Sequence, residues 1–283
     1  MRYASSPAKR VALLHHPKLP ESFSVAQEMQ RETQRLGVSA WLCSAWDEAG
    51  IQQQLDDTDL VVTLGGDGTI LRAARLVAPR GIPIVGINLG RIGFLAELGP
   101  KEWPEHWERI LQGRYRLESR LMLRATHVKD GEHQGSFEAL NDVVVSRAVL
   151  ARVVRLPTFI DGDYLTTYVC DGVIVSTATG STAYALAVGG PILPPDLHNI
   201  LLIPIAPHLS FSRAIVLAEG AKVRFQVQTD HRAVLTVDGQ FHVEVDDGDH
   251  VVVEASSHVC RFVRLGPPSY FYRTLMERLR WTV

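Results

Sequence analysis

The sequence contains little cysteine, and what it has is scattered along the chain. Its 3 cysteines are Cys43, Cys170 and Cys260, and no two of them form a Cys-x-x-Cys pair. An odd number of widely spaced cysteines indicates neither a disulfide framework nor a structural zinc site. Free thiols persist in reducing compartments. We therefore expect a cytoplasmic protein.

An excess of one charge and long apolar runs are also missing. The formal net charge is -2, so no basic field attracts nucleic acid or an anionic membrane. The longest apolar stretch, residues 200–209, is interrupted by Pro204 and Pro207 and is much shorter than the roughly 20 residues of a membrane-spanning helix. We expect no nucleic-acid partner and no membrane partner.

The chain is long enough for two domains. Its 283 residues exceed a typical single domain, and 46% of them are hydrophobic, as in ordinary globular proteins. The first part alternates apolar segments with amphipathic ones, which is typical of a parallel α/β sheet. Strands are predicted at residues 10–14, 40–42, 59–64 and 83–87, and helices at 24–36 and 70–78.

The pattern changes near residue 115. Short apolar segments then alternate with Asp-Gly turns, which is typical of antiparallel β structure. We predict an α/β domain over residues 1–115, completed by residues 260–283, and an all-β domain over residues 116–259. Residues 269–281 have a helical pattern, and we expect this C-terminal helix to pack back on the first domain.

A glycine-rich turn follows the strand predicted at residues 59–64. Residues 65–69 read Gly-Gly-Asp-Gly-Thr, and glycines let backbone N–H groups approach phosphate oxygens at a helix N-terminus. The carboxylate of Asp67 would repel a phosphate unless it binds Mg²⁺ or accepts a proton from an attacking hydroxyl. The structural alternative is a tight turn with Asp67 as the helix N-cap.

Two further segments are candidates for the same site. Residues 88–95 follow the next predicted strand and would begin at the same edge of the sheet. Residues 170–184 combine an acidic turn with hydroxyl side chains around Gly180, which suit sugar hydroxyls and phosphates. The alternatives are a glycine-punctuated loop for the first segment and a Ser/Thr-rich turn for the second.

Together these segments resemble the NAD kinase family. The match runs in order through residues 65–69, 88–95, 141–142, 171–184, 189–192, 204–208 and 237–240. The resemblance implies an α/β N-terminal domain with a phosphofructokinase-like parallel sheet and a C-terminal NAD kinase-like β-sandwich. It also implies an NAD⁺ kinase, a phosphotransferase that moves the γ-phosphoryl group of ATP to the 2′-hydroxyl of the adenosine ribose of NAD⁺, giving NADP⁺ and ADP.

The resemblance assigns roles to single residues. Asp67 corresponds to the catalytic carboxylate and is expected to act as general base. The implied cofactor is a divalent metal, Mg²⁺ or Mn²⁺, for which Asp67 is a candidate ligand and no other ligand is assigned. Family members are dimers or tetramers, so a homo-oligomer is expected. The implied nucleotide-binding residues are Gly65, Gly66, Gly68, Thr69, Arg72, Asn88, Phe94, Asn141, Asp142, Arg152, Asp171, Thr182, Ala183, Tyr184, Ala185, Leu186, Ala187, Ala206 and Gln240.

The chain departs from the family pattern at two places. Ala178 stands where many members have proline, and Val169-Cys170 stands where many have a basic residue followed by glycine, directly before Asp171. The second departure predicts the loss of a cation near an anionic substrate. Two alternatives stay open: the Gly-Gly-Asp-Gly element also fits a lipid or sugar kinase of the diacylglycerol kinase or phosphofructokinase type, and the missing basic residue fits a non-catalytic NAD(H)-binding sensor.

Overall fold

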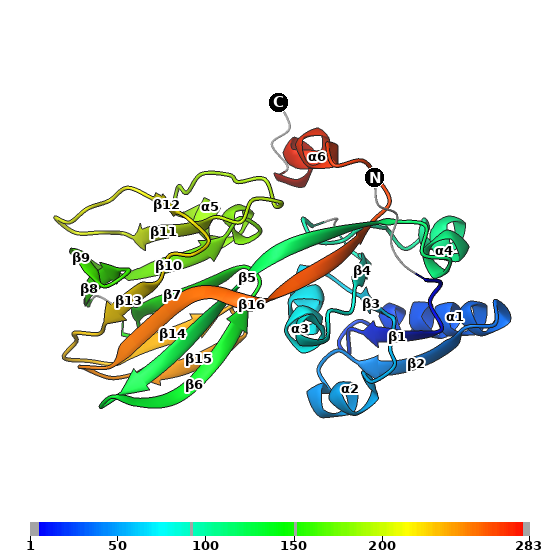
Figure 1. Ribbon diagram of the computed structural model, residues 1–283, viewed down its shortest axis with the longest axis horizontal. Helices are drawn as coiled ribbons and strands as arrows, with labels where there is room; N and C mark the ends of the chain where they lie inside the picture. The colour runs from blue at the N-terminus through cyan, green and yellow to red at the C-terminus, as the bar shows by residue number, and fades with distance from the viewer. Residues whose placement is uncertain (1–5, 91–92, 150–151, 280–283) are drawn as a thin grey trace. The chain divides into compact units, whose positions relative to one another are not determined.

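The computed structural model describes residues 6–90, 93–149 and 152–279. The chain divides into two compact units (Figure 1). The first unit comprises residues 1–119 and 259–283, and the second comprises residues 120–258. Within the described ranges, no helix has the length and apolarity that crossing a membrane requires.

The first unit contains a parallel sheet. Its strands are β1 (Arg10–His15), β2 (Ser39–Ser44), β3 (Leu60–Leu64), β4 (Ile84–Ile87) and the end of β16 (His250–Arg264). They lie in the order β2-β1-β3-β4-β16, and each neighbouring pair is parallel. Strands β3 and β4 are buried throughout, as expected when helices cover both faces of a sheet.

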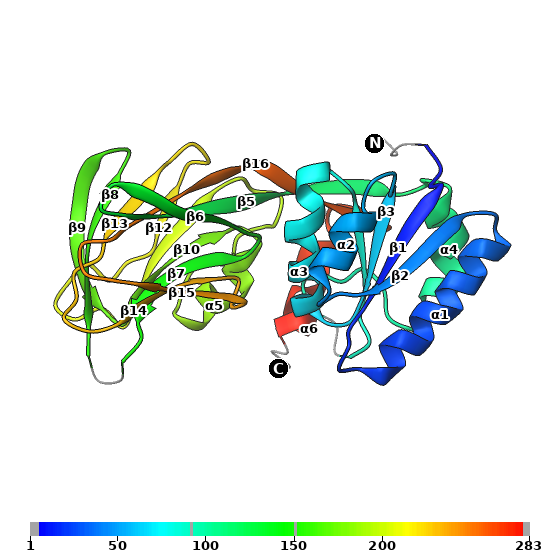
Figure 2. The same cartoon turned by 90° about the horizontal axis from the view of Figure 1, so that it is seen from below.

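Helices lie on both faces of this sheet (Figure 2). One face carries α1 (Pro20–Arg35) and α4 (Trp103–Leu111), and the other carries α2 (Glu48–Gln54) and α3 (Asp67–Val77). On the first face, Trp107 Nε1 donates to Thr33 Oγ1 at 3.0 Å, and Met29 packs with Leu13 and Val62 of the sheet. The second face is the one that bears the glycine-rich turn, because α3 starts there.

The second unit is a sandwich of antiparallel sheets. One sheet contains β5 (Arg116–Lys129), β6 (Glu132–Ala139), β8 (Val154–Ile160), β9 (Asp163–Cys170), β13 (Val223–Gln226) and the start of β16. The other contains β7 (Asp142–Arg147), β10 (Gly172–Thr177), β11 (Ile200–Ile205), β12 (Ile215–Leu217), β14 (Ala233–Val237) and β15 (Phe241–Val245), in the order β12-β11-β10-β7-β14-β15.

The core of the second unit lies between these two sheets. Leu123 and Phe225 from one sheet belong to the same buried cluster as Val145, Val175 and Leu235 from the other. The opposite face of the second sheet is covered in part by the short helix α5 (Tyr184–Ala187), whose Ala185 packs with β10 and β11. Side chains that alternate along β7 and β14 therefore face either the core or α5.

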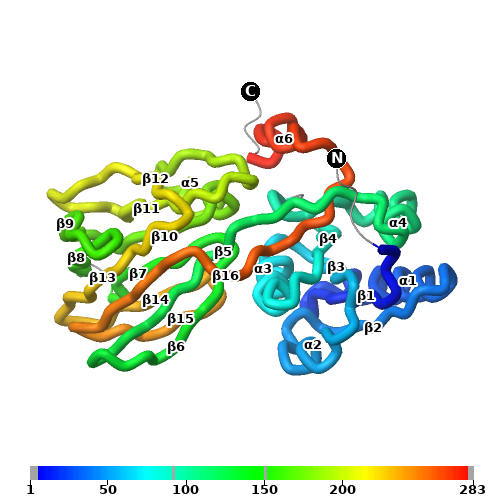
Figure 3. Tube along the Cα trace, in the orientation of Figure 1, coloured from blue at the N-terminus to red at the C-terminus, as the bar shows by residue number. Residues whose placement is uncertain are grey.

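The chain returns to the first unit through a long strand. β5 and β16 are paired and lie side by side although they are far apart in the sequence (Figure 3). α6 (Tyr270–Leu279) follows β16 and belongs to the first unit. The predicted fold class, an α/β domain and a β-rich domain with the C-terminal helix back on the first, is confirmed. Helix α3 begins at Asp67, earlier than the predicted residue 70, because the glycine-rich turn itself enters the helix.

Candidate active site

The segments after β3 and β4 start at one edge of the parallel sheet. Leu64 lies opposite Ile87, and the Gly65 amide donates to the Ile87 carbonyl at 3.0 Å. A Cβ on Gly65 would overlap the Thr69 hydroxyl, so this close approach requires glycine. The carboxyl edge of a parallel sheet is where such folds bind ligands.

The glycine-rich turn leaves open space above the start of α3. Gly66 is the N-cap in an extended conformation, and Gly66 and Gly68 are both exposed. A Cβ on either glycine would meet no atom of the described residues within 4 Å. A phosphate can therefore approach the backbone amides, and the positive end of the helix dipole favours it.

Asp67 is fixed by backbone amides of the neighbouring segment. Its Oδ2 accepts from Phe94 N at 2.9 Å, and its Oδ1 accepts from Leu95 N at 3.3 Å. The interpretation of Asp67 as an N-cap is wrong, since Gly66 holds that position and no side chain caps the helix. The two amides orient the carboxylate at the edge where the glycine-rich turn begins.

Asn88 and Arg72 belong to the same unit as this carboxylate. Asn88 is buried directly after β4, and its Oδ1 accepts from Gly90 N at 3.1 Å. The guanidinium of Arg72 lies 4.6 Å from the ring centre of Trp46, a cation–π distance. Residues 91–92 of the predicted segment 88–95 lie outside the described residues.

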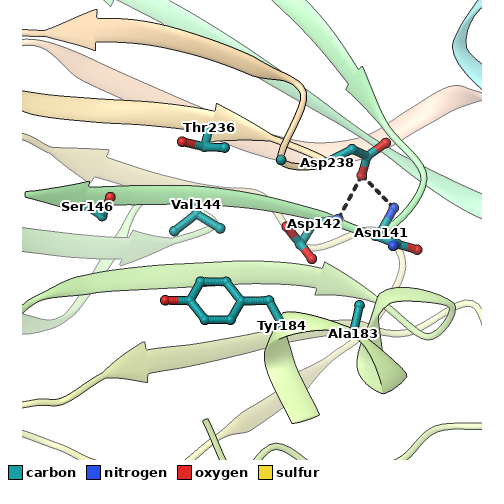
Figure 4. Close-up of a pocket in the computed structure, with 9 residues that line it drawn as sticks. Asn141, Asp142, Val144, Ser146, Ala183, Tyr184, Thr236 and Asp238 are labelled. Carbon is teal, nitrogen blue, oxygen red and sulfur yellow. Dashed lines mark hydrogen bonds between the residues drawn. The ribbon is translucent and has the colours of Figure 1, made fainter. Parts of the chain in front are cut away.

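A pocket of about 400 Å³ lies in the second unit, on the face of the sheet that carries α5 (Figure 4). Figure 4 shows Ala183 and Tyr184 on one side and residues of β7 and β14 on the other. Tyr184 keeps 46% of its surface exposed, so its ring is available to stack on a flat ligand. The lining residues are Asn141, Asp142, Val144, Ser146, Ala183, Tyr184, Thr236, Asp238 and Gly239.

Asp238 holds the start of β7 in place. Its carboxylate accepts from the amides of Leu140 (2.9 Å), Asn141 (2.8 Å) and Asp142 (3.1 Å). It belongs to the tight Asp238-Gly239 turn, in which both residues have positive φ, as the sequence pattern predicts. Two distant segments are thereby joined at the pocket, and the Asn141 and Asp142 side chains are displayed on a rigid backbone.

Asp142 has an unusual electrostatic environment. Burial, and then the negative charge of Asp238, raise the pKa of Asp142 from 3.8 to about 7. Desolvation and a like charge both disfavour the ionised carboxylate. Near neutral pH this group can therefore donate or accept a hydrogen bond in the pocket.

Hydroxyl side chains at the end of β10 stabilise the loop between β10 and α5 by hydrogen bonds. Thr177 Oγ1 donates to Leu140 O at 2.6 Å and accepts from Gly180 N at 3.0 Å. Ser176 Oγ donates to Asn141 O at 3.0 Å. A Cβ on Gly180 would overlap that same carbonyl. These buried hydroxyls shape the pocket rather than face it, so the interpretation as a Ser/Thr-rich turn holds for them.

The predicted residues around α5 divide between core and surface. Thr182 is half-buried and donates from Oγ1 to Thr179 O at 3.2 Å. Ala185 is fully buried, Leu186 is half-buried and Ala187 is exposed. Of this run, Ala183 and Tyr184 reach the pocket lining.

Asp171 has a cationic partner that the sequence analysis missed. Arg147, at the end of β7, donates from Nε to Asp171 Oδ1 (2.8 Å) and from Nη2 to Oδ2 (3.0 Å). This hydrogen-bonded ion pair lowers the pKa of Asp171. Val169-Cys170 lacks the basic residue, as the sequence shows, but Arg147 supplies a different cation beside Asp171. The signal was the Arg147 that ends the β7 strand, 24 residues before Asp171.

The remaining predicted residues lie apart from the pocket lining. Ala206 directly follows β11 with φ 45°, and the Asp171 amide donates to the preceding carbonyl of Ile205 at 3.0 Å. Gln240 follows the Asp238-Gly239 turn and is half-buried. Arg152 is exposed and lines a separate hollow of about 360 Å³ with Arg155, Gln228 and His231, among others.

Asp67 fits a cation that arrives with a nucleotide. Among the described residues, no group of three or more His, Cys, Asp or Glu side chains could hold a metal ion. Mg²⁺ commonly keeps several waters and binds one or two carboxylates together with substrate phosphates. A single carboxylate beside a phosphate loop matches that type of site.

Comparisons with known proteins cover both units. Residues 10–115 match the ATP-NAD kinase N-terminal domain, and residues 140–265 match the ATP-NAD kinase C-terminal domain. The chain is 43% identical to an NAD kinase of Chloroflexus aggregans over 272 residues, which is 96% of this chain and 99% of that protein. It is 46% identical to an NAD kinase of Heliobacterium modesticaldum over 231 residues, 81% of each.

Solved structures agree with these matches. A yeast NADH kinase complexed with NADH superposes with a TM-score of 0.87 at 28% identity, covering 98% of this chain and 89% of that chain. An NAD kinase from Archaeoglobus fulgidus in complex with ATP superposes with a TM-score of 0.78 at 27% identity, covering 97% and 100%. The chain belongs to the ATP-NAD kinase family.

Proposed function

We propose that this chain transfers the γ-phosphoryl group of ATP to the 2′-hydroxyl of the adenosine ribose of NAD⁺, giving NADP⁺ and ADP. One observation carries the mechanism: Asp67 is oriented by the Phe94 and Leu95 amides at the edge where the glycine-rich turn begins. Family membership supplies the acceptor, since curated NAD kinases match nearly the whole chain.

The turn at residues 65–69 would bind the phosphates of ATP. Gly66 and Gly68 are exposed at the start of α3, and the positive end of the helix dipole favours an anion there. Arg72, on the second turn of α3, adds a cation from the same helix. The NAD kinase of Archaeoglobus fulgidus was solved with ATP, which supports ATP as the donor.

Asp67 would act as the general base. It accepts the proton of the ribose 2′-hydroxyl while that oxygen forms a bond to the γ-phosphorus, and the bond to the β-phosphate oxygen breaks to release ADP. Because phosphoryl transfer depends mainly on positioning and electrostatics, the fixed orientation of the carboxylate is the relevant property. A divalent cation, Mg²⁺ or Mn²⁺, would neutralise phosphate charge, and binding of that metal is the alternative role of Asp67.

The pocket of the second unit would bind the dinucleotide. Asn141 and Asp142 present amide and carboxyl groups suited to the edge of a purine, and Tyr184 presents an exposed ring. Asp171, Ala206 and Gln240 are proposed as further contacts. The yeast relative was solved with NADH, which supports a nicotinamide dinucleotide as the ligand.

We also propose a homo-oligomer, a dimer or tetramer, in the cytoplasm. The segment after Ala206 exposes apolar side chains, with Leu209 96%, Phe211 45% and Val216 48% exposed, and such groups are often covered by a partner. Light scattering would test the oligomer. Cys43, Cys170 and Cys260 are free thiols, in keeping with a reducing compartment, and cell fractionation would test the location.

The proposed function is tested by a matrix of ATP or polyphosphate against NAD⁺ or NADH, run for the wild type, Asp67→Asn and the control Asp57→Asn. Asp57 is exposed with φ 62°, a conformation that asparagine tolerates. Asp67→Asn should lower kcat about 10²–10⁴-fold, with NAD⁺ binding retained by calorimetry. Near wild-type turnover of Asp67→Asn would overturn the assignment of Asp67 as base, and absence of NADP⁺ formation by the wild type would overturn the activity.

A further inference from the structure

The two residues that bind Asp67 through their amides are themselves bound through their carbonyls. Arg278 Nη1 donates to Phe94 O at 2.9 Å, and Arg264 Nη1 donates to Leu95 O at 3.1 Å. Both arginines come from the C-terminal part of the chain, in α6 and at the end of β16. All of these residues belong to the first unit.

One peptide group connects Arg278 with Asp67. The carbonyl of Phe94 and the amide of Leu95 are the two ends of the same peptide unit, with the guanidinium at the carbonyl end and the carboxylate at the amide end. Hydrogen bonds in such a chain polarise one another and become stronger. A cation on the carbonyl therefore favours the amide as a donor to the carboxylate.

Arg264 fixes the next carbonyl from a rigid position. Its side chain is 1% exposed and pairs with Glu97 Oε2 at 3.0 Å and Glu118 Oε1 at 3.1 Å. The other carboxylate oxygen of Glu97 accepts from the Leu265 amide at 2.6 Å. A buried guanidinium held by two carboxylates has little freedom to move. Its hydrogen bond therefore also restricts the position of the Leu95 carbonyl.

The ring of Tyr270 joins the two arginines. Its centre lies 5.4 Å from the Arg264 guanidinium and 5.3 Å from that of Arg278, both within cation–π range. Arg278 also lies 5.9 Å from the centre of the Phe94 ring. Phe94 is thus contacted at its carbonyl and at its ring by the same side chain.

We propose that Arg264 and Arg278 are positioning residues for the phosphoryl-transfer reaction, acting on Asp67 through the Phe94–Leu95 peptide. This inference rests on the proposed function, in which Asp67 is the base. The arginines make no contact with substrate in this scheme. They fix the two amides that set the direction of the carboxylate, and small misplacements of a catalytic group cost up to about 10²-fold in rate.

The test uses Arg278→Met, Arg278→Lys and the control Arg273→Met in the full-length protein. Arg273 is an exposed arginine of the same helix. Arg278→Met should lower kcat about tenfold or more while the KM for NAD⁺ stays within about twofold. Arg278→Lys should recover part of the loss, because an ammonium still donates to Phe94 O. Equal kcat for Arg278→Met and Arg273→Met would overturn the proposal.

A double-mutant comparison asks whether the effect passes through Asp67. In the Asp67→Asn background, Arg278→Met should change the residual rate less than about twofold, since groups that act as a unit are not additive. The same tenfold loss in both backgrounds would overturn the proposal. If Arg278→Met does not fold by circular dichroism, Arg278→Gln replaces it, because it keeps a polar side chain but removes the cation, and wild-type kcat for Arg278→Gln is then the contradicting result.

These results separate this inference from the proposed function. Loss of turnover in Asp67→Asn together with wild-type kcat in Arg278→Met would reject the positioning role alone. Wild-type turnover in Asp67→Asn would reject the catalytic base and, with it, the basis for positioning. Arg264→Lys provides an independent measurement. For this variant too, kcat should fall while the KM for NAD⁺ stays nearly unchanged.

Discussion

Gly93 lies so close to Asp67 that a Cβ at this position would overlap the carboxylate. Gly93→Ala should therefore turn the carboxylate away from the Phe94 and Leu95 amides. We expect kcat to fall up to about 10²-fold with the KM for NAD⁺ nearly unchanged. Steady-state kinetics measure both, and Gly220→Ala, where a Cβ meets open space among the described residues, is the control. Unchanged kcat for Gly93→Ala would contradict the expectation.

Asp238 should matter for both stability and binding because one carboxylate serves three amides. In Asp238→Asn an NH₂ group replaces one acceptor, so a buried amide loses its partner at a cost of about 1–3 kcal/mol. We expect a lower Tm and weaker NAD⁺ binding by calorimetry. Asp247→Asn is the matched control, since Asp247 accepts from the amide of Thr229 in an exposed turn. Equal Tm losses in the two variants would refute this role.

Stability should depend on the protonation of Asp142. Its folded-state pKa of about 7 lies above the ordinary 3.8, so the folded protein binds this proton more tightly than the unfolded chain. The stabilising contribution is complete below pH 4 and is lost as the pH rises through 7, with a ceiling of about 4 kcal/mol.

In the Asp142→Asn variant, the side chain at position 142 cannot ionise. The variant's gain in Tm over the wild type should therefore be larger at pH 8 than at pH 5, as measured by calorimetric melting at both values. Asp163→Asn, a change at an exposed aspartate of the same unit, serves as the reference. A gain for Asp142→Asn that is the same at the two pH values would exclude the linkage.

Arg147 should support dinucleotide binding by neutralising Asp171. Arg147→Met removes two hydrogen bonds to that carboxylate and leaves its negative charge uncompensated. If Asp171 contacts the dinucleotide as proposed, its uncompensated charge should raise the KM for NAD⁺ about tenfold, on the order of one charge-assisted interaction, with kcat little changed. Arg232→Met, which removes an exposed pair with Glu244, should have no such effect.

A second substitution should restore binding in Arg147→Met. Val169 occupies the position where many family members carry a basic residue. Val169→Arg in the Arg147→Met background should recover part of the NAD⁺ affinity, and raised salt should reduce the benefit. Failure of both the single and the double variant to change KM would show that charge at Asp171 is unimportant.

The features that can be predicted from the sequence are those that depend on residues close together in the chain. Apolar periodicity locates β3 and β4, and the contiguous motif of residues 65–69 identifies the candidate phosphate loop. The Asp-Gly turn at residues 238–239 follows from its own two residues. Each of these strands and turns is determined by neighbouring residues, so hydrophobic periodicity and turn preferences predict it directly.

Contacts between distant segments could not be predicted in this way. Phe94 and Arg278 are 184 residues apart, and Arg147, at the end of β7, is 24 residues from Asp171, which lies between β9 and β10. Arginines at these positions have no periodicity that marks their partners. The carbonyl and amide contacts of Phe94 and Leu95 depend on backbone atoms, which carry no sequence signal at all. The amide contacts that orient the Asp67 carboxylate were missed for the same reason.

The late arrival of β16 has a consequence for biosynthesis. This strand pairs with β4 and supplies Arg264 to Glu97 and Glu118, yet the ribosome completes it only after the whole of residues 120–258 has been made. Until then the edge of β4 lacks this neighbour, and open strand edges are sites of aggregation. The sheet of the first unit is therefore completed only after residues 120–258 have been synthesised.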